Sequence, residues 1–214
     1  DALLHEDLAA LERGLPNLLR HVANMKDVYG LPTVVAINRF PTDTEAELDL
    51  VRERCRELGA ETALSDVWAQ GGAGGTELAE AVVKLCEEPG DFRFAYGLDG
   101  GIEDKLRAVV QRVYRGRDID VLPEAAAQID RLTALGMAHM PVCIAKTQYS
   151  FSDDKTKLGA PEDFTVTVRE VKVSAGAGFI VALTGDVLTM PGLPKSPAAE
   201  RIDVDSTGKI SGLF

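Results

Sequence analysis

The chain has 214 residues and a formal net charge of −11, with 45% hydrophobic and 27% charged residues. This is an ordinary globular composition, and the length suffices for one large domain or two small ones. The negative charge argues against nucleic acid or an anionic membrane surface as a partner. The sequence has no run of about 18 apolar residues, the length that a transmembrane helix needs.

Cysteine and histidine usage gives no sign of a metal site. The cysteines Cys55, Cys86 and Cys143 are far apart and form no CxxC pair, and the three histidines are isolated from one another. Neither a zinc ribbon nor a disulfide framework is supported, and we predict no metal site. Residues 1–12 lack the basic start and apolar run of a signal peptide. Reduced cysteines in a cytoplasmic protein are the simplest interpretation.

The first half of the chain predicts alternating helices and strands. Apolar residues recur at helical spacing over residues 4–25, and residues 33–37 form an apolar run typical of a strand buried on both faces. Thr44 and Glu47 form a capping box that begins a helix ending near Leu58. A second strand and helix are predicted at 61–64 and 76–87. This order indicates a parallel α/β sheet.

The second half continues the alternation and then changes. Helices are predicted over 102–114 and 123–135, and strands at 118–121 and 142–145. After Lys146, residues 164–173 alternate with period two, residues 179–183 predict another strand, and 203–208 predict a turn between two short strands. We therefore predict an α/β fold: a parallel sheet flanked by helices in residues 1–146, and a smaller β-rich C-terminal lobe in residues 147–214.

Candidate binding residues follow the first two predicted strands. In an open parallel sheet, ligands bind beyond the carboxyl ends of the strands. Phe40 and Pro41 follow the first strand, and Trp68, the single tryptophan, follows the second. The two aromatic side chains could sandwich a flat heterocycle; packing in the core is the alternative, and the sequence by itself favours it. Arg39 and Lys146 are candidate anion contacts, with simple solvation as the alternative.

The glycine-rich segment 71–75 does not have the pattern of a phosphate loop. It precedes a helix, so its amides could hold an anion, but it fits neither GxGxxG nor GxxxxGK[ST]. A tight loop is the simpler interpretation. The Gly-Lys dipeptide at 208–209 is followed by isoleucine, and no glycine stands five residues before it. We predict no residues that hold ATP phosphates by themselves, and no catalytic residue.

Several longer segments point to a known family. They are Val34–Thr44 (VVAINRFPTDT), Pro141–Ser150 (PVCIAKTQYS), Thr167–Val171 (TVREV), Ser174–Phe179 (SAGAGF) and Met190–Lys195 (MPGLPK). Together they closely resemble formate–tetrahydrofolate ligases (10-formyltetrahydrofolate synthetases), in the order of that family. The resemblance runs from about residue 34 to the end, where residues 212–214 look like the family's C-terminus.

The resemblance implies an activity and a binding site. The activity is the ATP-dependent condensation of formate with tetrahydrofolate, which gives 10-formyltetrahydrofolate, ADP and phosphate through formyl phosphate. The implied site holds the pterin ring between Phe40 and Trp68, with Leu64 lining the same pocket and Pro41 in the same motif. Formate, tetrahydrofolate and ATP with Mg²⁺ are the implied substrates. A homo-oligomer, a homotetramer in the family, is the implied assembly, and the helical surface of residues 1–28 is a candidate contact.

One departure from the family bears on activity. Family members carry an N-terminal nucleotide-binding domain with a phosphate loop, and this sequence lacks that loop. We therefore expect the chain to be the C-terminal part of such a ligase, supplying the pterin-binding side and inactive without the nucleotide-binding domain. A non-catalytic assembly or folding module derived from the ligase is one alternative. A nucleotide-binding domain of another class is a second, against which the missing phosphate loop counts.

Overall fold

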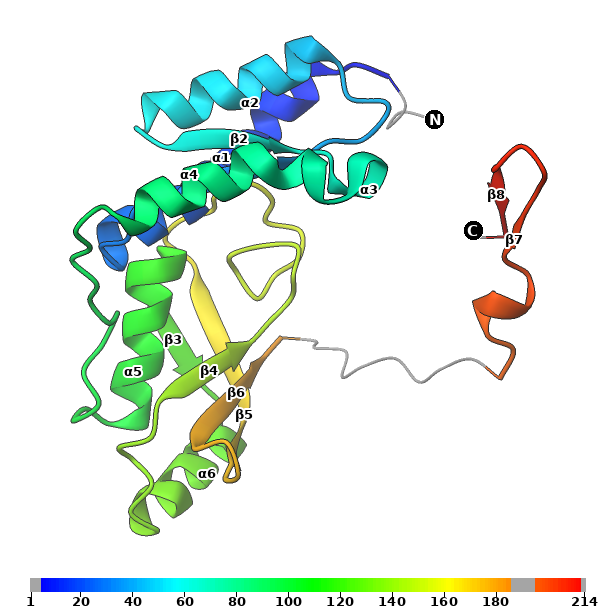
Figure 1. The fold of residues 1–214 in the computed structure, drawn as a ribbon. Helices are drawn as coiled ribbons and strands as arrows, with labels where there is room; N and C mark the ends of the chain where they lie inside the picture. Colours follow the sequence, from blue (N-terminus) through cyan, green and yellow to red (C-terminus); the bar gives the residue numbers. More distant parts are fainter. Residues whose placement is uncertain (1–4, 186–194, 213–214) are drawn as a thin grey trace.

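The computed structural model describes residues 5–185 and 195–212 (Figure 1). Residue 4 of the predicted helical stripe lies outside the described residues, as do most of the resembling segment Met190–Lys195 and the last two residues of the chain. Within the described ranges, no helix is long and apolar enough to cross a membrane. The fold is α/β, with parallel strand pairs flanked by helices and further strands toward the C-terminus.

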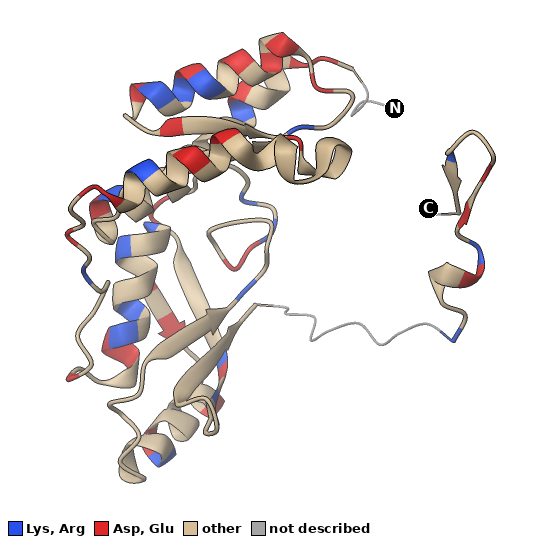
Figure 2. Cartoon of the chain, viewed as in Figure 1, with Lys and Arg blue, Asp and Glu red and all other residues tan. Residues whose placement is uncertain are grey.

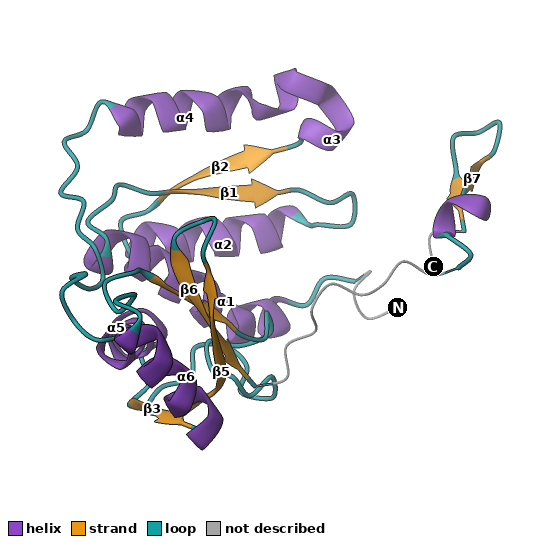
Figure 3. Ribbon diagram, turned by 90° about the horizontal axis from the view of Figure 1, so that it is seen from below, coloured by secondary structure: helices purple, strands orange, loops and turns teal. Residues whose placement is uncertain are grey.

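A parallel strand pair lies between two layers of helices in the N-terminal part. Strands β1 (Val34–Asn38) and β2 (Glu61–Ser65) pair along their whole length, with Val34 opposite Glu61. Helix α4 (Thr76–Cys86) covers one face of the pair, and α2 (Glu45–Glu57) covers the other (Figure 3). Helix α1 (Leu8–Ala23) packs against α2. The predicted strand–helix–strand–helix order is confirmed here.

Local signals determine the ends of α2. The Thr44 hydroxyl accepts from the amide of Glu47, and the Glu47 carboxylate accepts from the amide of Thr44 at 3.0 Å, so the predicted capping box is formed. Gly59 follows the helix with a φ of +64°, a left-handed conformation that favours glycine. Acidic and basic residues are interspersed along α2 (Figure 2).

Strand β1 is not buried on both faces, contrary to the sequence prediction. Val35 is 9% exposed and packs with Val22 and Cys55 on the side of α1 and α2. On the opposite face Ala36 is exposed, although its partner on β2, Ala63, is 1% exposed. Helix α4 packs more extensively on β2 than on β1, so this position on β1 is covered less than its partner on β2.

The second part of the fold is a four-stranded mixed sheet in the order β3-β5-β6-β4. Strands β3 (Asp118–Val121) and β4 (Val142–Ala145) are the outer strands, and β5 (Thr165–Ser174) and β6 (Phe179–Thr184) form an antiparallel hairpin between them. Strand β3 runs parallel to β5, and β4 parallel to β6. The third and fourth predicted strands therefore do not extend the β1–β2 pair. Strands from both sides of residue 146, the expected domain boundary, share this sheet.

Helices α5 (Ile102–Val109) and α6 (Pro123–Ala134) pack on this sheet. Two short π-helices extend the helical segments, η2 (Asn24–Val28) after α1 and η4 (Val110–Tyr114) after α5. The main core lies between these helices and the sheet, and its members are at most 8% exposed; they include Ile102, Leu106, Val110, Ile119, Val166 and Ile180. This core is separate from the smaller cluster beneath β1.

The remaining described elements are short. Helix α3 (Val67–Gln70) and the 3₁₀ helix η3 (Gly71–Gly75) join β2 to α4. The 3₁₀ helix η5 (Ala198–Glu200) precedes the antiparallel pair β7 (Asp203–Val204) and β8 (Ile210–Ser211). The predicted turn between two short C-terminal strands is therefore confirmed.

Candidate functional site

The carboxyl ends of β1 and β2 bring the two predicted aromatic residues to one edge. Asn38 and Ser65 are the last paired residues, and the amide of Arg39 donates to the carbonyl of Ser65 at 3.1 Å. Trp68 lies in α3, and its indole Nε1 donates to the backbone carbonyl of Arg39 at 2.9 Å. This hydrogen bond ties the indole to the residue that directly precedes Phe40.

Neither aromatic side chain belongs to the core. Phe40 is 59% exposed and Trp68 is 64% exposed, so the core-packing alternative does not describe them. Pro41 is exposed beside Phe40, and Leu64 is half-buried opposite Ile37 at the second-last position of the pair. Large exposed apolar side chains at a strand edge are available to a ligand. The structure thus brings Phe40, Pro41, Leu64 and Trp68 to the same edge.

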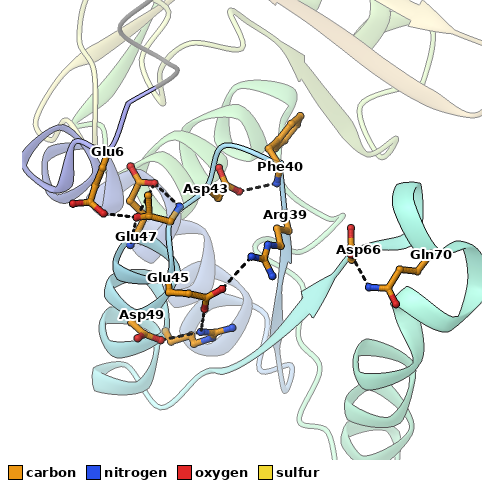
Figure 4. A network of polar contacts seen from close by, with 11 residues as sticks. Glu6, Arg39, Phe40, Asp43, Glu45, Glu47, Asp49, Asp66 and Gln70 are labelled. Carbon is orange, nitrogen blue, oxygen red and sulfur yellow. Dashed lines mark hydrogen bonds and ion pairs between the residues drawn. The ribbon is translucent and has the colours of Figure 1, made fainter. Parts of the chain in front are cut away.

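Hydrogen bonds hold the loop that carries Phe40. The carboxylate of Asp43 accepts from the amide of Phe40 at 2.8 Å, and the amide of Asp43 donates to the carbonyl of Phe40 at 3.1 Å. Arg39 is turned toward the start of α2, where its guanidinium pairs with Glu45 at 3.0 Å (Figure 4). Both partners of this pair are more than a third exposed, so an anionic ligand could compete for Arg39.

The glycine-rich segment is a 3₁₀ helix packed on the start of α3. The amide of Asp66 donates to the carbonyl of Gly74 at 3.0 Å, and a Cβ on Gly74 would lie 2.3 Å from the carbonyl oxygen of Asp66. Only glycine permits this approach. The carboxylate of Asp66 accepts from the side-chain amide of Gln70 at 2.7 Å. Sequence reasoning did not single out Asp66; the signal that could have found it is a carboxylate directly after a predicted parallel strand.

Lys146 lies in the other sheet, at the end of β4. Its ammonium group donates to the carbonyls of Thr147, at 3.0 Å, and of Ser150, and it lies 5.3 Å from the centre of the Tyr114 ring. Burial lowers the pKa of Lys146. These contacts tie Lys146 to its own loop and to η4, rather than to the loops of Phe40 and Trp68.

Beside Lys146, His21 gives the fold a pH-dependent contribution. Burial, and then the charge of Lys146, lower the pKa of His21, whose ring lies 4.6 Å from that of Phe151. The unfolded chain therefore takes up the His21 proton more readily than the folded chain does. We expect the free energy of unfolding to fall as the pH drops from about 7.5 through about 6.5, the pKa of an unperturbed histidine.

Urea unfolding at pH 7.5 and 5.5 checks this expectation. His21→Gln should lose less stability over this interval than the parent, and the exposed His139→Gln should behave like the parent. Equal losses in the parent and His21→Gln would contradict the assignment to His21.

Potential metal-binding side chains do not cluster in the described part of the chain. Among residues 5–185 and 195–212, no group of three or more His, Cys, Asp or Glu side chains is placed to hold an ion. Cys55, Cys86 and Cys143 are free thiols. The described site therefore consists of aromatic and apolar side chains with several carboxylates nearby, among them Asp43 and Asp66.

The chain is thus an α/β protein whose first two strands end at an edge that carries exposed aromatic side chains. The family model for formate–tetrahydrofolate ligase matches residues 1–214. Because the match covers the whole sequence, the chain belongs to the formate–tetrahydrofolate ligase family. A ligase-type function in folate one-carbon chemistry follows from this membership.

Proposed function

We propose that the chain binds tetrahydrofolate with the pterin ring between Phe40 and Trp68, as its part in the ATP-dependent formylation of that substrate. The observation that carries the proposal is the convergence of two exposed aromatic side chains at one edge, joined by the Trp68 Nε1 bond to Arg39. Leu64 and Pro41 contribute apolar surface beside the rings. A planar ring gains both buried area and stacking from such a pair.

The proposed reaction has two steps. A formate oxygen attacks the γ-phosphorus of ATP, ADP leaves, and formyl phosphate results. The N10 amine of tetrahydrofolate then attacks the formyl carbon, phosphate leaves, and the nitrogen loses its proton. The residues of this chain act in the second step: they hold the pterin, so that the amine meets the acyl carbon in a fixed geometry. Because the stacked rings displace water from the site, that water cannot hydrolyse the acyl phosphate.

We assign no ATP contact and no catalytic residue to this chain. Its sequence contains no GxxxxGK[ST] segment, so the first step is proposed to depend on the family's nucleotide-binding domain, which brings ATP and Mg²⁺. Arg39 and Lys146 remain proposed anion contacts, and Arg39 is the one that lies at the aromatic edge. We also propose that the chain forms a homo-oligomer and acts in the cytoplasm. The free thiols support the cytoplasmic location.

Replacing either aromatic side chain tests the proposal. Trp68→Ala and Phe40→Ala should each weaken tetrahydrofolate binding by about 1–3 kcal/mol, or about 5- to 150-fold, because each change removes a stacked ring and its buried area. Anaerobic calorimetric titration of the purified chain measures the affinity. Phe94→Ala is the matched control, because it removes an aromatic side chain that is 77% exposed and lies in the loop between α4 and α5.

The outcomes separate the proposal from its main alternative. Binding that both site variants weaken, and that Phe94→Ala leaves unchanged, supports the pterin site. A parent chain that self-associates without affinity for tetrahydrofolate would favour an assembly module instead. Equal affinity in the parent, Trp68→Ala and Phe40→Ala would remove both residues from the site.

A further inference from the structure

Asp66 stands between the apolar and aromatic parts of the edge. It follows the last residue of β2, two positions after Leu64 and two before Trp68. An aspartate at this position before a helix ordinarily caps the helix through its side chain. Here the side chain makes no capping bond to α3, and its Oδ2 atom accepts from Gln70 at 2.7 Å instead. The half-buried carboxylate lies at the same end of the strand pair as Phe40 (Figure 4).

Other carboxylates near this end of β1 and β2 are engaged by a hydroxyl, by backbone amides or by arginine. Glu6 accepts from the hydroxyl of Thr44 at 2.6 Å. Asp43 accepts from the amide of Phe40. Glu45 pairs with Arg39 and Arg52. Glu47 accepts from the amides of Asp7 and Thr44. Among the described residues of this edge, Asp66 differs from these carboxylates because it accepts from a side-chain amide, that of Gln70.

The backbone of Asp66 is fixed before any ligand arrives. Its amide donates to the carbonyl of Gly74, and its carbonyl accepts from the amides of Ala69 and Gln70. The backbone of Gly74 also packs closely on this segment, since an added Cβ would lie 2.3 Å from the carbonyl oxygen of Asp66. A group held in this way loses little freedom when a ligand binds to it.

Pterin chemistry supplies a matching partner for such a carboxylate. The 2-amino group and the neighbouring N3–H of the pterin are two adjacent donors in the plane of the ring. A carboxylate can accept from both at once, in the paired geometry that makes such contacts strong and directional. Stacking between Phe40 and Trp68 tolerates any flat ring. A pair of in-plane hydrogen bonds recognises the pterin and fixes its rotation between the rings.

We propose that Asp66 determines substrate specificity by accepting hydrogen bonds from the 2-amino group and N3–H of the pterin. The inference rests on the proposed tetrahydrofolate site and adds the group that orients the ring within it. With this edge of the pterin held by Asp66, the opposite end of the substrate, which bears N10, points away from the strand ends. Gln70 steadies the carboxylate through its side-chain amide.

The test pairs one substitution with one change in the ligand. Asp66→Asn preserves the shape of the side chain, and its amide oxygen can still accept from Gln70, but it sets an NH₂ group against the pterin donors. We expect Asp66→Asn to weaken tetrahydrofolate binding about 10- to 100-fold, the range for losing hydrogen bonds to a charged group. The second ligand is a tetrahydrofolate analogue with hydrogen in place of the 2-amino group. It should bind the parent more weakly, and Asp66→Asn should weaken it much less than tetrahydrofolate.

Calorimetry on the full 214-residue chain gives the four affinities, and Glu80→Gln is the control. Glu80 is an exposed residue of α4, the helix that covers the β1–β2 pair. Its substitution therefore removes one negative charge near the strand pair but changes no residue of the aromatic edge. A loss specific to Asp66→Asn and to the ligand with the 2-amino group supports the inference. Equal losses for both ligands would assign Asp66 a structural or overall electrostatic role and overturn it.

Two further outcomes distinguish this inference from the proposed function. In the first, the parent binds tetrahydrofolate, Trp68→Ala weakens this binding, and Asp66→Asn leaves it unchanged. The pterin site is then supported and the role of Asp66 is overturned. If the parent does not bind tetrahydrofolate at all, the proposed site fails, and the role of Asp66 fails with it.

Discussion

Replacing Gly74 with alanine should remove most of the affinity for tetrahydrofolate, with a loss above about 3 kcal/mol, more than either aromatic substitution causes alone. The new Cβ would lie 2.3 Å from the carbonyl oxygen of Asp66, 2.5 Å from its carbonyl carbon and 3.0 Å from the amide of Val67. All three atoms belong to the backbone, so no side-chain rotation relieves the clash. The start of α3 has to move, and it carries both Asp66 and Trp68 with it.

Gly72→Ala is the matched control for this prediction. It makes the same chemical change two residues earlier in η3, where an added Cβ meets nothing within 4 Å. Calorimetric titration of the two variants and the parent, with circular dichroism to compare their folded content, checks the result. We expect Gly72→Ala to bind like the parent. Parent-like binding by Gly74→Ala would show that the packing of η3 does not position the site.

Replacing Lys105 with alanine should lower the free energy of unfolding by about 3–5 kcal/mol. The side chain of Lys105 on α5 is 1% exposed, and its ammonium group donates to the carbonyls of Ala138 at 2.6 Å and Met140 at 3.0 Å. Burial lowers the pKa of Lys105, which shows that the charged ammonium group is desolvated at a cost. Part of the stabilisation from the two hydrogen bonds offsets this cost. Alanine removes both donations and leaves a cavity where the aliphatic stem was.

Lys105→Met separates the two contributions. Methionine keeps most of the apolar stem but cannot donate, so its expected cost is about 1–3 kcal/mol, the range for leaving buried acceptors without a partner. Urea unfolding followed by far-ultraviolet circular dichroism gives both values. Lys105→Ala within about 1 kcal/mol of the parent would mean that the contact between α5 and the segment before β4 adds little stability.

The parts of the fold that were predictable from the sequence depend on local interactions. The capping box of Thr44 and Glu47 and the glycine at position 59 lie within a few residues of the helix ends that they determine. The short apolar runs that became β1 and β2 are bounded by such signals on both sides. The meeting of Phe40 and Trp68 followed from the parallel order of these strands, because their carboxyl ends lie at one edge.

The sheet arrangement could not be predicted in the same way, because strand pairing depends on contacts between distant segments. Nothing in the predicted strands at 118–121 and 142–145 distinguishes pairing with β1–β2 from pairing with the hairpin β5–β6. The exposure of Ala36 depends on where α4 lies, and the sequence of β1 does not determine the position of that helix. Asp66 was not singled out because an aspartate before a helix is ordinarily a cap, and the sequence does not show that its side chain makes no such bond.

The hydrogen bond from the indole of Trp68 to Arg39 also has a practical consequence. Trp68 is the single tryptophan of the chain, so all of the indole fluorescence of the protein comes from the aromatic edge. The emission is therefore an intrinsic optical probe that needs no label. A ligand stacked on the ring would quench it, and displacement of the Phe40 loop would shift its wavelength. The core around β5 and β6 has no tryptophan of its own, so comparison with circular dichroism can resolve whether the two parts of the fold melt together.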